Sequence, residues 1–408
     1  MRITRVGAVA VAAGAALSLA ACGSGFDDGS GDQDSTAPLT VLIGSSGDAE
    51  TAAVKQAVAD WSADSGTDAT VTVASDLVQE LAQGFSSGEP ADVFYLSTDQ
   101  LANYASNGSL YAYGDDLSNK DDFYPSLVKS FTYDGTFYCA PKDFSTLQLV
   151  INTDLWSQAG LTDADIPTTW DELSAVATKL TTGGATGLVM SGEYARVGVF
   201  MTQAGGNLMN DDSSEATADS DANLQALQYV KDNLAAGDFA FAADVGAGWG
   251  GEAFGKQLGA MTIEGNWITG AMTNDFPDVN YKVVPLPEGP AGAGTLQFTN
   301  CWGIAADSPN KEGALDLVQK LTSTDDQLAF STAFGVMPSI QSAADQWKAD
   351  NPALVPFLDG ADYAHGVPTA KGSADVVTDF NSQLGQLASS DPKAILESTQ
   401  QNLEALLK

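Results

Sequence analysis

The sequence of 408 residues contains one histidine and three cysteines, which limits the chemistry that it can perform. A Ser–His–Asp or Cys–His nucleophile would have to use His365, and no Gly-x-Ser-x-Gly motif is present. Two Ser-x-x-Lys patterns, at residues 126–129 and 308–311, consist of common residue types and arise by chance. One histidine and two distant cysteines cannot supply the ligands of a zinc site. We therefore predict no catalytic residues, no metal and no cofactor.

Basic residues are also few. The chain contains 17 Lys and Arg residues and 53 Asp and Glu residues, which gives a net charge of -36. A field of this sign repels phosphate backbones, so nucleic acid is an unfavourable partner, and anionic ligands would need a local basic pocket. Hydrophobic residues still make up 44% of the chain, which suits a globular protein with more than one domain.

Long apolar runs are missing after the first 22 residues. The one such run, at residues 6–17, follows two arginines and precedes Leu19-Ala20-Ala21-Cys22, an arrangement typical of a secretory signal peptide. The last four residues resemble a bacterial lipobox, whose cysteine becomes the first mature residue and carries lipid. We predict a signal peptide at 1–21, lipidation of Cys22, a flexible linker at 22–37 and anchorage at the extracellular face of the cell membrane. An ordinary secretory signal is the alternative.

The remaining cysteines are Cys139 and Cys301. An even pair in an oxidising compartment allows a disulfide. Composition alone is equally compatible with two unrelated buried thiols, so the residues themselves leave both possibilities open.

Apolar patterning from residue 39 onward predicts alternating strands and helices. The alternation indicates an α/β protein with mostly parallel sheets, in which ligands bind beyond the carboxyl ends of the strands. The loops after Ile43 and after Leu96 are therefore candidate ligand sites. The predicted strands are residues 39–43, 69–73, 91–96, 147–151, 187–190, 281–286 and 302–306.

A Gly-x-Gly-x-x-Gly match at residues 246–251 does not predict a dinucleotide site, because no clear βαβ unit surrounds it. Its glycines permit close approach of a ligand, and Trp249 either stacks on that ligand or packs as an ordinary apolar residue. Pairs of carboxylates that would suit a glycosidase are easily found among 53 acidic residues, and no pair stands out by context. An enzyme is therefore the less favoured prediction.

Five further blocks occur in one order between about residues 39 and 339. They are YDGTFYCAP at 133–141, LVINTDLW at 149–156, GAMTIEGNW at 259–267, SPNKE at 308–312 and FGVMP at 334–338. Together they resemble the extracellular solute-binding proteins of bacterial ABC sugar importers, of the maltose-binding-protein type (family 1). The third block is similar to the family's GxAAM…GxW signature.

The resemblance implies a two-lobed α/β fold of the periplasmic-binding-protein type (type II), with a ligand cleft between lobes joined by hinge strands. The N-terminal lobe corresponds to residues 38–142 plus 302–336, and the C-terminal lobe to residues 145–299 plus 339–408. The chain then crosses between the lobes near residues 140–145, 299–302 and 335–339. Cys139 and Cys301 lie at two crossings that are neighbours in the family, so the resemblance also implies a Cys139–Cys301 disulfide.

A saccharide site is implied as well. Trp267 corresponds to a family tryptophan that stacks on a sugar ring, and Glu193 to a carboxylate that accepts hydrogen bonds from hydroxyls. Tyr95 and Asp99 correspond to residues that face the cleft. Packing of Trp267 against its own helix and a solvated position for Glu193 are the alternatives. The other candidate ligand-binding residues are Trp249, Asn266, Ser46, Asp143, Phe144 and Asn300.

Three departures from the maltose-binding member put maltose itself in doubt. Ser45 and Ser46 replace an Asp-Lys pair, Gln100 replaces an arginine, and a third stacking tryptophan has no counterpart closer than Phe380. We predict a monomeric, lipid-anchored receptor without enzymatic activity. It captures a neutral oligosaccharide by lobe closure and delivers it to the transmembrane subunits of an ABC permease. The alternatives are an exported carbohydrate-active enzyme and a receptor for a peptide or polyamine.

Overall fold

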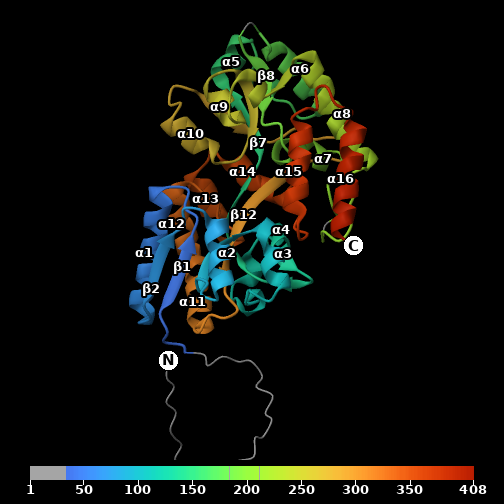
Figure 1. Ribbon diagram of the computed structural model, residues 1–408. Coiled ribbons are helices and arrows are strands. Elements are labelled where there is room, and N and C mark those ends of the chain that lie inside the picture. Colours follow the sequence, from blue (N-terminus) through green and yellow to red (C-terminus); the bar gives the residue numbers. More distant parts are fainter. Residues whose placement is uncertain (1–33, 183, 211) are drawn as a thin grey trace, which may run out of the picture.

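Residues 34–182, 184–210 and 212–408 are described by the computed structural model, which has two lobes, each built around its own sheet (Figure 1). The predicted signal peptide, Cys22 and most of the linker lie outside the described residues. Residues 34–37, the last part of the predicted linker, contact the first lobe. There the Asp34 N–H donates to the Pro309 carbonyl and the Asn310 side-chain amide donates to the Ala37 carbonyl, both at 2.8 Å.

The first lobe holds a six-stranded sheet with the order β13-β12-β3-β1-β2, and β6 pairs with β12. Its strands are β1 (Leu39–Ile43), β2 (Ala69–Val73), β3 (Val93–Ser97), β6 (Ala140–Thr146), β12 (Thr295–Ile304) and β13 (Ala364–His365). Its helices are α1 (Asp48–Ser65), α2 (Leu77–Ser87), α3 (Thr98–Ser106), α4 (Pro125–Ser130), α11 (Lys311–Leu321) and α12 (Thr324–Phe334). A separate hairpin joins β4 (Thr132–Tyr133) and β5 (Thr136–Phe137).

The second lobe holds a five-stranded sheet with the order β11-β7-β10-β8-β9. Its strands are β7 (Gln148–Asn152), β8 (Thr186–Met190), β9 (Phe239–Phe241), β10 (Gly259–Glu264) and β11 (Tyr281–Val284). Its helices are α5 (Thr153–Gln158), α6 (Trp170–Leu180), α7 (Tyr194–Gln203), α8 (Asp221–Ala236), α9 (Gly250–Gly255), α10 (Ile268–Asn274), α15 (Ser373–Leu384) and α16 (Pro392–Leu406). Two shorter helices, α13 (Ala344–Asp350) and α14 (Val355–Asp359), follow the last crossing between the lobes.

Burial explains why these segments form the elements that they do. In β1 the residues Leu39, Val41 and Ile43 alternate with less buried neighbours and are at most 1% exposed. In α1 the residues Val54 and Val58 recur at helical spacing on the buried face. The buried residues of β1 and the buried face of α1 belong to the same hydrophobic cluster. This is the strand–helix pattern that the sequence predicts for the region.

The expectation of mostly parallel sheets is only partly correct. β1 pairs in parallel with β2 and β3, and β8 pairs in parallel with β9 and β10. However, β12 is antiparallel to β3 and β6, and β7 is antiparallel to β10 and β11. The antiparallel strands include those that carry the chain between the lobes, where no crossover helix imposes parallel pairing. The strand predicted at 302–306 is the end of one longer strand, β12.

The hydrophobic core is divided between the lobes. One cluster draws on residues 39–140 and 301–343, and a second on residues 147–296 and 376–403. A third cluster includes Phe144 of β6, Met337 and Trp347, and so lies where the crossings meet. These clusters mark the cores of the lobes and not their boundaries, so the residue limits given for the lobes stay a proposal. Among the described residues, no helix has both the length and the apolar character needed to cross a membrane.

Candidate functional site in the cleft between the lobes

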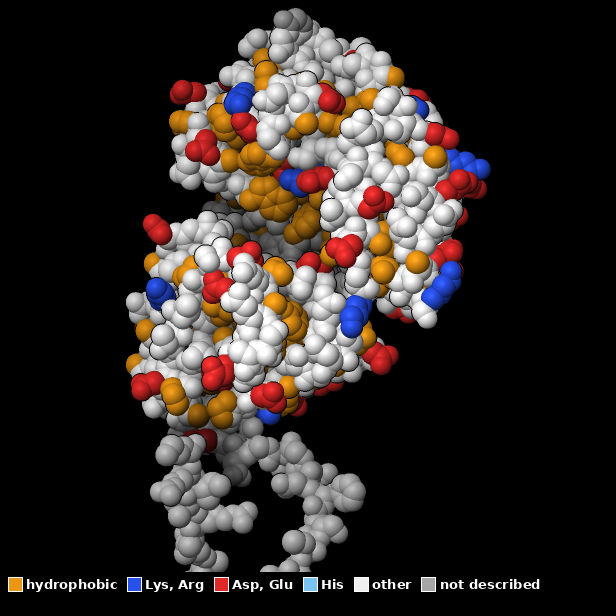
Figure 2. Space-filling model, viewed as in Figure 1, with side chains coloured by type: hydrophobic (Ala, Val, Ile, Leu, Met, Phe, Trp, Pro, Cys, Tyr) orange, Lys and Arg blue, Asp and Glu red, His pale blue; other side chains and the backbone are white. Residues whose placement is uncertain are grey.

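A cleft of about 620 Å³ separates the two lobes, and Figure 2 shows it as a deep hollow with hydrophobic side chains on its walls. Residues of both lobes and of the crossing strands line it. Seven of the ten predicted ligand-binding residues are among them, namely Ser46, Asp99, Asp143, Phe144, Asn266, Trp267 and Asn300.

The loops after β1 and β3 reach the cleft as predicted, because the carboxyl ends of these parallel strands meet at one edge of the sheet. Gly44 and Ser46 follow β1, and Asp99 lies in the first turn of α3 directly after β3. On the crossing strands, Asp143 and Phe144 of β6 and Asn300 of β12 complete the floor.

A buried group of charges underlies the wall of the first lobe. The Lys142 ammonium contacts Glu50 Oε1 at 3.2 Å and also pairs with Asp143. Glu50 Oε2 accepts hydrogen bonds from the N–H and the hydroxyl of Ser46, each at 2.7 Å. Burial acts to raise the pKa of Glu50, but Lys142 and the Ser46 hydrogen bonds outweigh it and lower that pKa. Burial raises the pKa of the Asp143 carboxyl, although the Lys142 ammonium opposes this shift.

Tyr95 packs against this group of charges on the side away from the cleft. The expectation that Tyr95 faces the cleft is therefore corrected. It is 2% exposed and does not line the cleft. Its hydroxyl donates to Glu50 Oε1 at 3.0 Å, and its ring lies 4.5 Å from the Lys142 ammonium. All the residues of β3 from Val93 to Leu96 are buried, as expected for a strand that lies between β12 and β1 inside the sheet.

Trp267 forms the wall of the second lobe. It is 38% exposed, the largest side chain among the exposed hydrophobic residues of the described chain. Its Nε1 donates to Glu264 Oε2 at 2.9 Å, and the Arg196 guanidinium lies 5.4 Å from its ring. Phe298 meets the same ring edge to face at 5.8 Å. The indole is therefore held in a fixed orientation with free apolar surface in the cleft.

Arg196 and Glu264 form a buried ion pair beneath this tryptophan. Glu264 is fully buried, and burial raises the pKa of its carboxyl although Arg196 opposes the shift. Arg196 also contacts Glu193 Oε1 at 2.7 Å. The position of Trp267 thus depends on a charge pair in the core of the second lobe.

Glu193 and Trp249 do not line the cleft itself, which corrects the expectation for both. They line a neighbouring pocket of about 470 Å³, of which Arg196 is also part. Asn381 lines both cavities, so the pocket adjoins the cleft at that residue. Glu193 directly precedes α7 and Trp249 directly precedes α9.

Phe380 is not a third stacking platform. It is fully buried and packs against Tyr194 with ring centroids 6.0 Å apart. His365 lies in β13 beside a separate cavity near α4, and among the described residues no three His, Cys, Asp or Glu side chains gather as a metal site.

The sequence analysis did not single out the four residues of the two buried ion pairs beside the cleft, namely Glu50, Lys142, Arg196 and Glu264. Glu50 and Lys142 are 92 positions apart in the chain, and Arg196 and Glu264 are 68 positions apart, so sequence spacing could not reveal either pair. One signal was available: Glu264 lies within the GAMTIEGNW block, three residues before Trp267.

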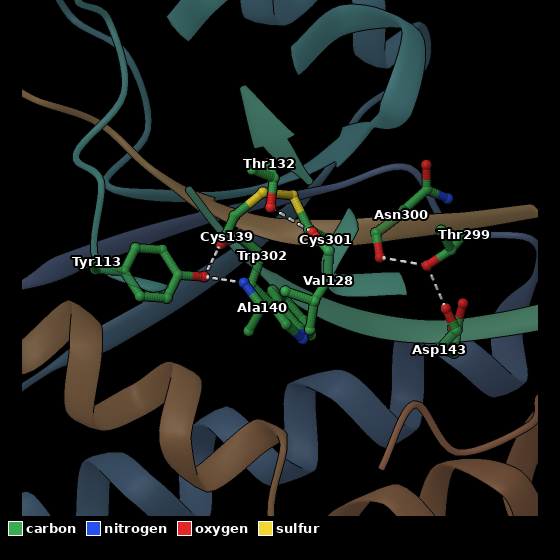
Figure 3. The surroundings of a disulfide bond; sticks show 10 residues. All are labelled: Tyr113, Val128, Thr132, Cys139, Ala140, Asp143, Thr299, Asn300, Cys301 and Trp302. Carbon is green, nitrogen blue, oxygen red and sulfur yellow. Dashed lines mark hydrogen bonds between the residues drawn. A yellow bond between two sulfur atoms is a disulfide. The ribbon is translucent and has the colours of Figure 1, made fainter. Parts of the chain in front are cut away.

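The structure contains a disulfide between Cys139 and Cys301, which joins the start of β6 to β12 (Figure 3). Beside it, the Tyr113 hydroxyl accepts a hydrogen bond from the Ala140 N–H at 2.9 Å and donates to the Trp302 carbonyl. Both cysteines are at most 1% exposed. The crossing strands are thus linked covalently at their first-lobe end.

Loss of this disulfide should destabilise the protein. The bond closes a loop across 162 positions of sequence, and removing a native disulfide lowers the free energy of unfolding by about 2 to 4 kcal/mol. The Cys139→Ser/Cys301→Ser variant is therefore expected to unfold at lower denaturant concentration than the wild type. Mass measurement of alkylated native protein, with and without reductant, is the accompanying check. Two free thiols in the native protein would contradict the bond.

Comparisons with known proteins agree with this architecture. A family model described as bacterial extracellular solute-binding protein matches residues 55–356. A putative binding protein of Brucella abortus (strain 2308) is 26% identical over 350 residues, 81% of this chain and 83% of that protein. The diacetylchitobiose binding protein DasA of Streptomyces coelicolor is 26% identical over 368 residues, 83% of this chain and 82% of that protein. The GacH receptor of Streptomyces glaucescens GLA.O, solved unliganded and with acarbose, has a TM-score of 0.78 at 22% identity, covering 91% of this chain and 98% of that chain. The likeness confirms the predicted fold class.

Proposed function

The chain belongs to the bacterial extracellular solute-binding protein family, and from this premise we propose that it captures a neutral oligosaccharide between its lobes and delivers it to the transmembrane subunits of an ABC permease. Membership of this family makes it an exported binding protein. The sugar, the permease, the lipid anchor and a monomeric state are parts of the proposal.

The observation that carries the proposal is the exposed indole of Trp267 in a cleft that also offers uncharged polar side chains. A sugar ring presents apolar C–H faces and a rim of hydroxyls, so it needs a flat aromatic surface together with hydrogen-bonding side chains. Asn266, Thr299 and Asn300 supply such groups within the same cleft. The names of two similar proteins, a diacetylchitobiose binding protein and a receptor solved with acarbose, support a saccharide ligand.

The charges in the cleft support a neutral ligand rather than an anion. Lys142 is the cation of the lining, and its ammonium already pairs with Glu50 and Asp143. Asp99 adds a further carboxylate. An anionic sugar would therefore lose its hydration without gaining an available cation among the described lining residues. The relatives named above are binding proteins, and His365 is not among the described residues that line the cleft.

A thermal-shift screen tests the proposed function. A ligand that binds only the folded state raises the apparent melting temperature. The panel holds maltodextrins, N,N′-diacetylchitobiose, cellobiose, short peptides and polyamines. We expect the largest shift from a neutral oligosaccharide and no hydrolysis of it on prolonged incubation. A shift given by peptides or polyamines alone, or cleavage of a sugar, would contradict the proposal.

The lipid anchor has its own test. If Cys22 carries lipid, Cys22→Ala should release the protein from cells into the medium while its saccharide affinity stays unchanged, because the cleft lies in the two lobes. Fractionation followed by a binding assay on the released protein measures both properties. A Cys22→Ala protein that stays with the membrane would count against lipidation at this residue.

A further inference from the structure

The two crossing strands lose their regular register beside the cleft. β6 and β12 pair from Gln297 with Thr146 to Asn300 with Asp143, but the next residue, Cys301, pairs with Pro141. Lys142 is therefore an extra residue in β6 and forms a β-bulge. In a regular strand, successive side chains point to opposite faces, whereas at the bulge the Lys142 ammonium pairs with the carboxylate of its neighbour Asp143, and both residues line the cleft. The bulge thus places the two neighbouring charges together.

Buried side chains satisfy the main-chain groups that the bulge leaves outside the ladder. Gln327 of α12 is 1% exposed, and its Nε2 donates to the Lys142 carbonyl at 2.8 Å. The Gln327 Oε1 accepts from the Ser339 N–H at 2.8 Å, and the Ser339 hydroxyl donates to the Pro141 carbonyl at 2.7 Å. One amide side chain therefore ties the bulge to the third crossing between the lobes.

The bulge affects the cleft through the position of the Asp143 carboxylate. One carboxylate oxygen, Oδ2, pairs with the Lys142 ammonium, which also contacts Glu50. The other, Oδ1, accepts no hydrogen bond from any residue in the described part of the chain and is left for a donor from a ligand. Asp143 is fixed on one side and available on the other only while Lys142 stays beside it.

We propose that Gln327 is a positioning residue for ligand binding, because it holds the β-bulge that keeps Lys142 and Asp143 side by side in the cleft. Gln327 itself does not line the cleft and touches no ligand. The proposal rests on the proposed function in one respect: the affinity that is measured to test it is the affinity for a saccharide.

Gln327→Met tests the proposal, since methionine fills a similar volume without the amide. With maltotetraose and N,N′-diacetylchitobiose as calorimetric probes at 25 °C, we expect an affinity loss of about tenfold or more for the probe that the wild type binds. Lys142→Met should give a similar loss, and the double variant should lose no more than the larger single loss, because both changes remove the same arrangement. Gln319→Met is the matched control. Its amide oxygen accepts from the Ser118 N–H, and neither residue lines the cleft, so the affinity of this variant should equal that of the wild type.

Two results would overturn the inference. In the first, the Gln327→Met variant melts at a lower temperature but binds the sugar within about twofold of the wild-type affinity, so that Gln327 is merely structural. In the second, the affinity losses of Gln327→Met and Lys142→Met multiply in the double variant, so that the two residues act independently. A crystal structure of Gln327→Met supplies a readout that needs no ligand: we expect Lys142 to leave the cleft, and an unchanged bulge would overturn the inference. A wild type that binds neither sugar while the variant loses its bulge would count against the proposed function alone.

Discussion

Trp267→Ala is expected to lower the affinity for the saccharide by about 30-fold or more, equivalent to about 2 kcal/mol of binding free energy. The indole is the large apolar surface that the cleft offers to a sugar ring, and its orientation is fixed by Glu264 and Phe298. Alanine removes the surface and leaves the polar lining in place. Isothermal titration calorimetry with the saccharide chosen by the thermal-shift screen measures the effect.

The control for this experiment is Trp267→Phe. Phenylalanine keeps a flat ring but cannot donate to Glu264, so its affinity should fall between those of the wild type and Trp267→Ala. Because Trp267 is partly exposed, both variants should keep the circular dichroism spectrum of the wild type. Unchanged affinity in Trp267→Ala would show that the ligand does not stack on this residue.

Arg196→Met is expected to lower the free energy of unfolding by about 3 to 5 kcal/mol at neutral pH. The substitution leaves the carboxylate of Glu264, which is fully buried, without its cation. Urea denaturation compares the variant with Lys120→Met, which removes an exposed pair with Asp115 and should leave stability almost unchanged. Adding Glu264→Gln to Arg196→Met removes the buried charge and should recover much of the loss. A double variant as unstable as Arg196→Met would contradict this account.

The loss in Arg196→Met should depend on pH. Burial already raises the pKa of Glu264 in the wild type, and removing Arg196 takes away the charge that opposes this shift. The folded variant then binds more protons at Glu264 than the unfolded chain does. Stability therefore falls as pH rises through this range, and the destabilisation should be smaller at pH about 5 than at pH about 8. Equal losses at both pH values would contradict a charged, buried Glu264.

The sequence predicted those site residues that depend on local pattern. Ser46 and Asp99 follow strands whose apolar runs are plain, and parallel strands bring their carboxyl ends to one edge. Trp267 lies in a block that resembles the family signature, and the Cys139–Cys301 disulfide was implied by the same resemblance. Each of these inferences needed no side-chain contact between distant segments.

The residues that were missed or misplaced depend on tertiary packing. A β-bulge leaves no mark in the apolar alternation, so Lys142 could not be assigned to the cleft beside Asp143. Tyr95 was expected in the cleft because it corresponds to a family residue that faces it, but this correspondence does not show that Tyr95 lies in a fully buried stretch of β3. Glu193 was placed by its correspondence to a family carboxylate, which does not show that Arg196 holds the Glu193 carboxylate beside a neighbouring pocket.

The most direct test of a saccharide receptor is calorimetric titration of the wild-type protein with the neutral oligosaccharide that gives the largest thermal shift. The account predicts one site per chain, a dissociation constant of about 10 μM or lower, and a sugar recovered intact after the titration. Absence of binding to every neutral oligosaccharide of the panel, together with saturable binding of a peptide or polyamine, would contradict it.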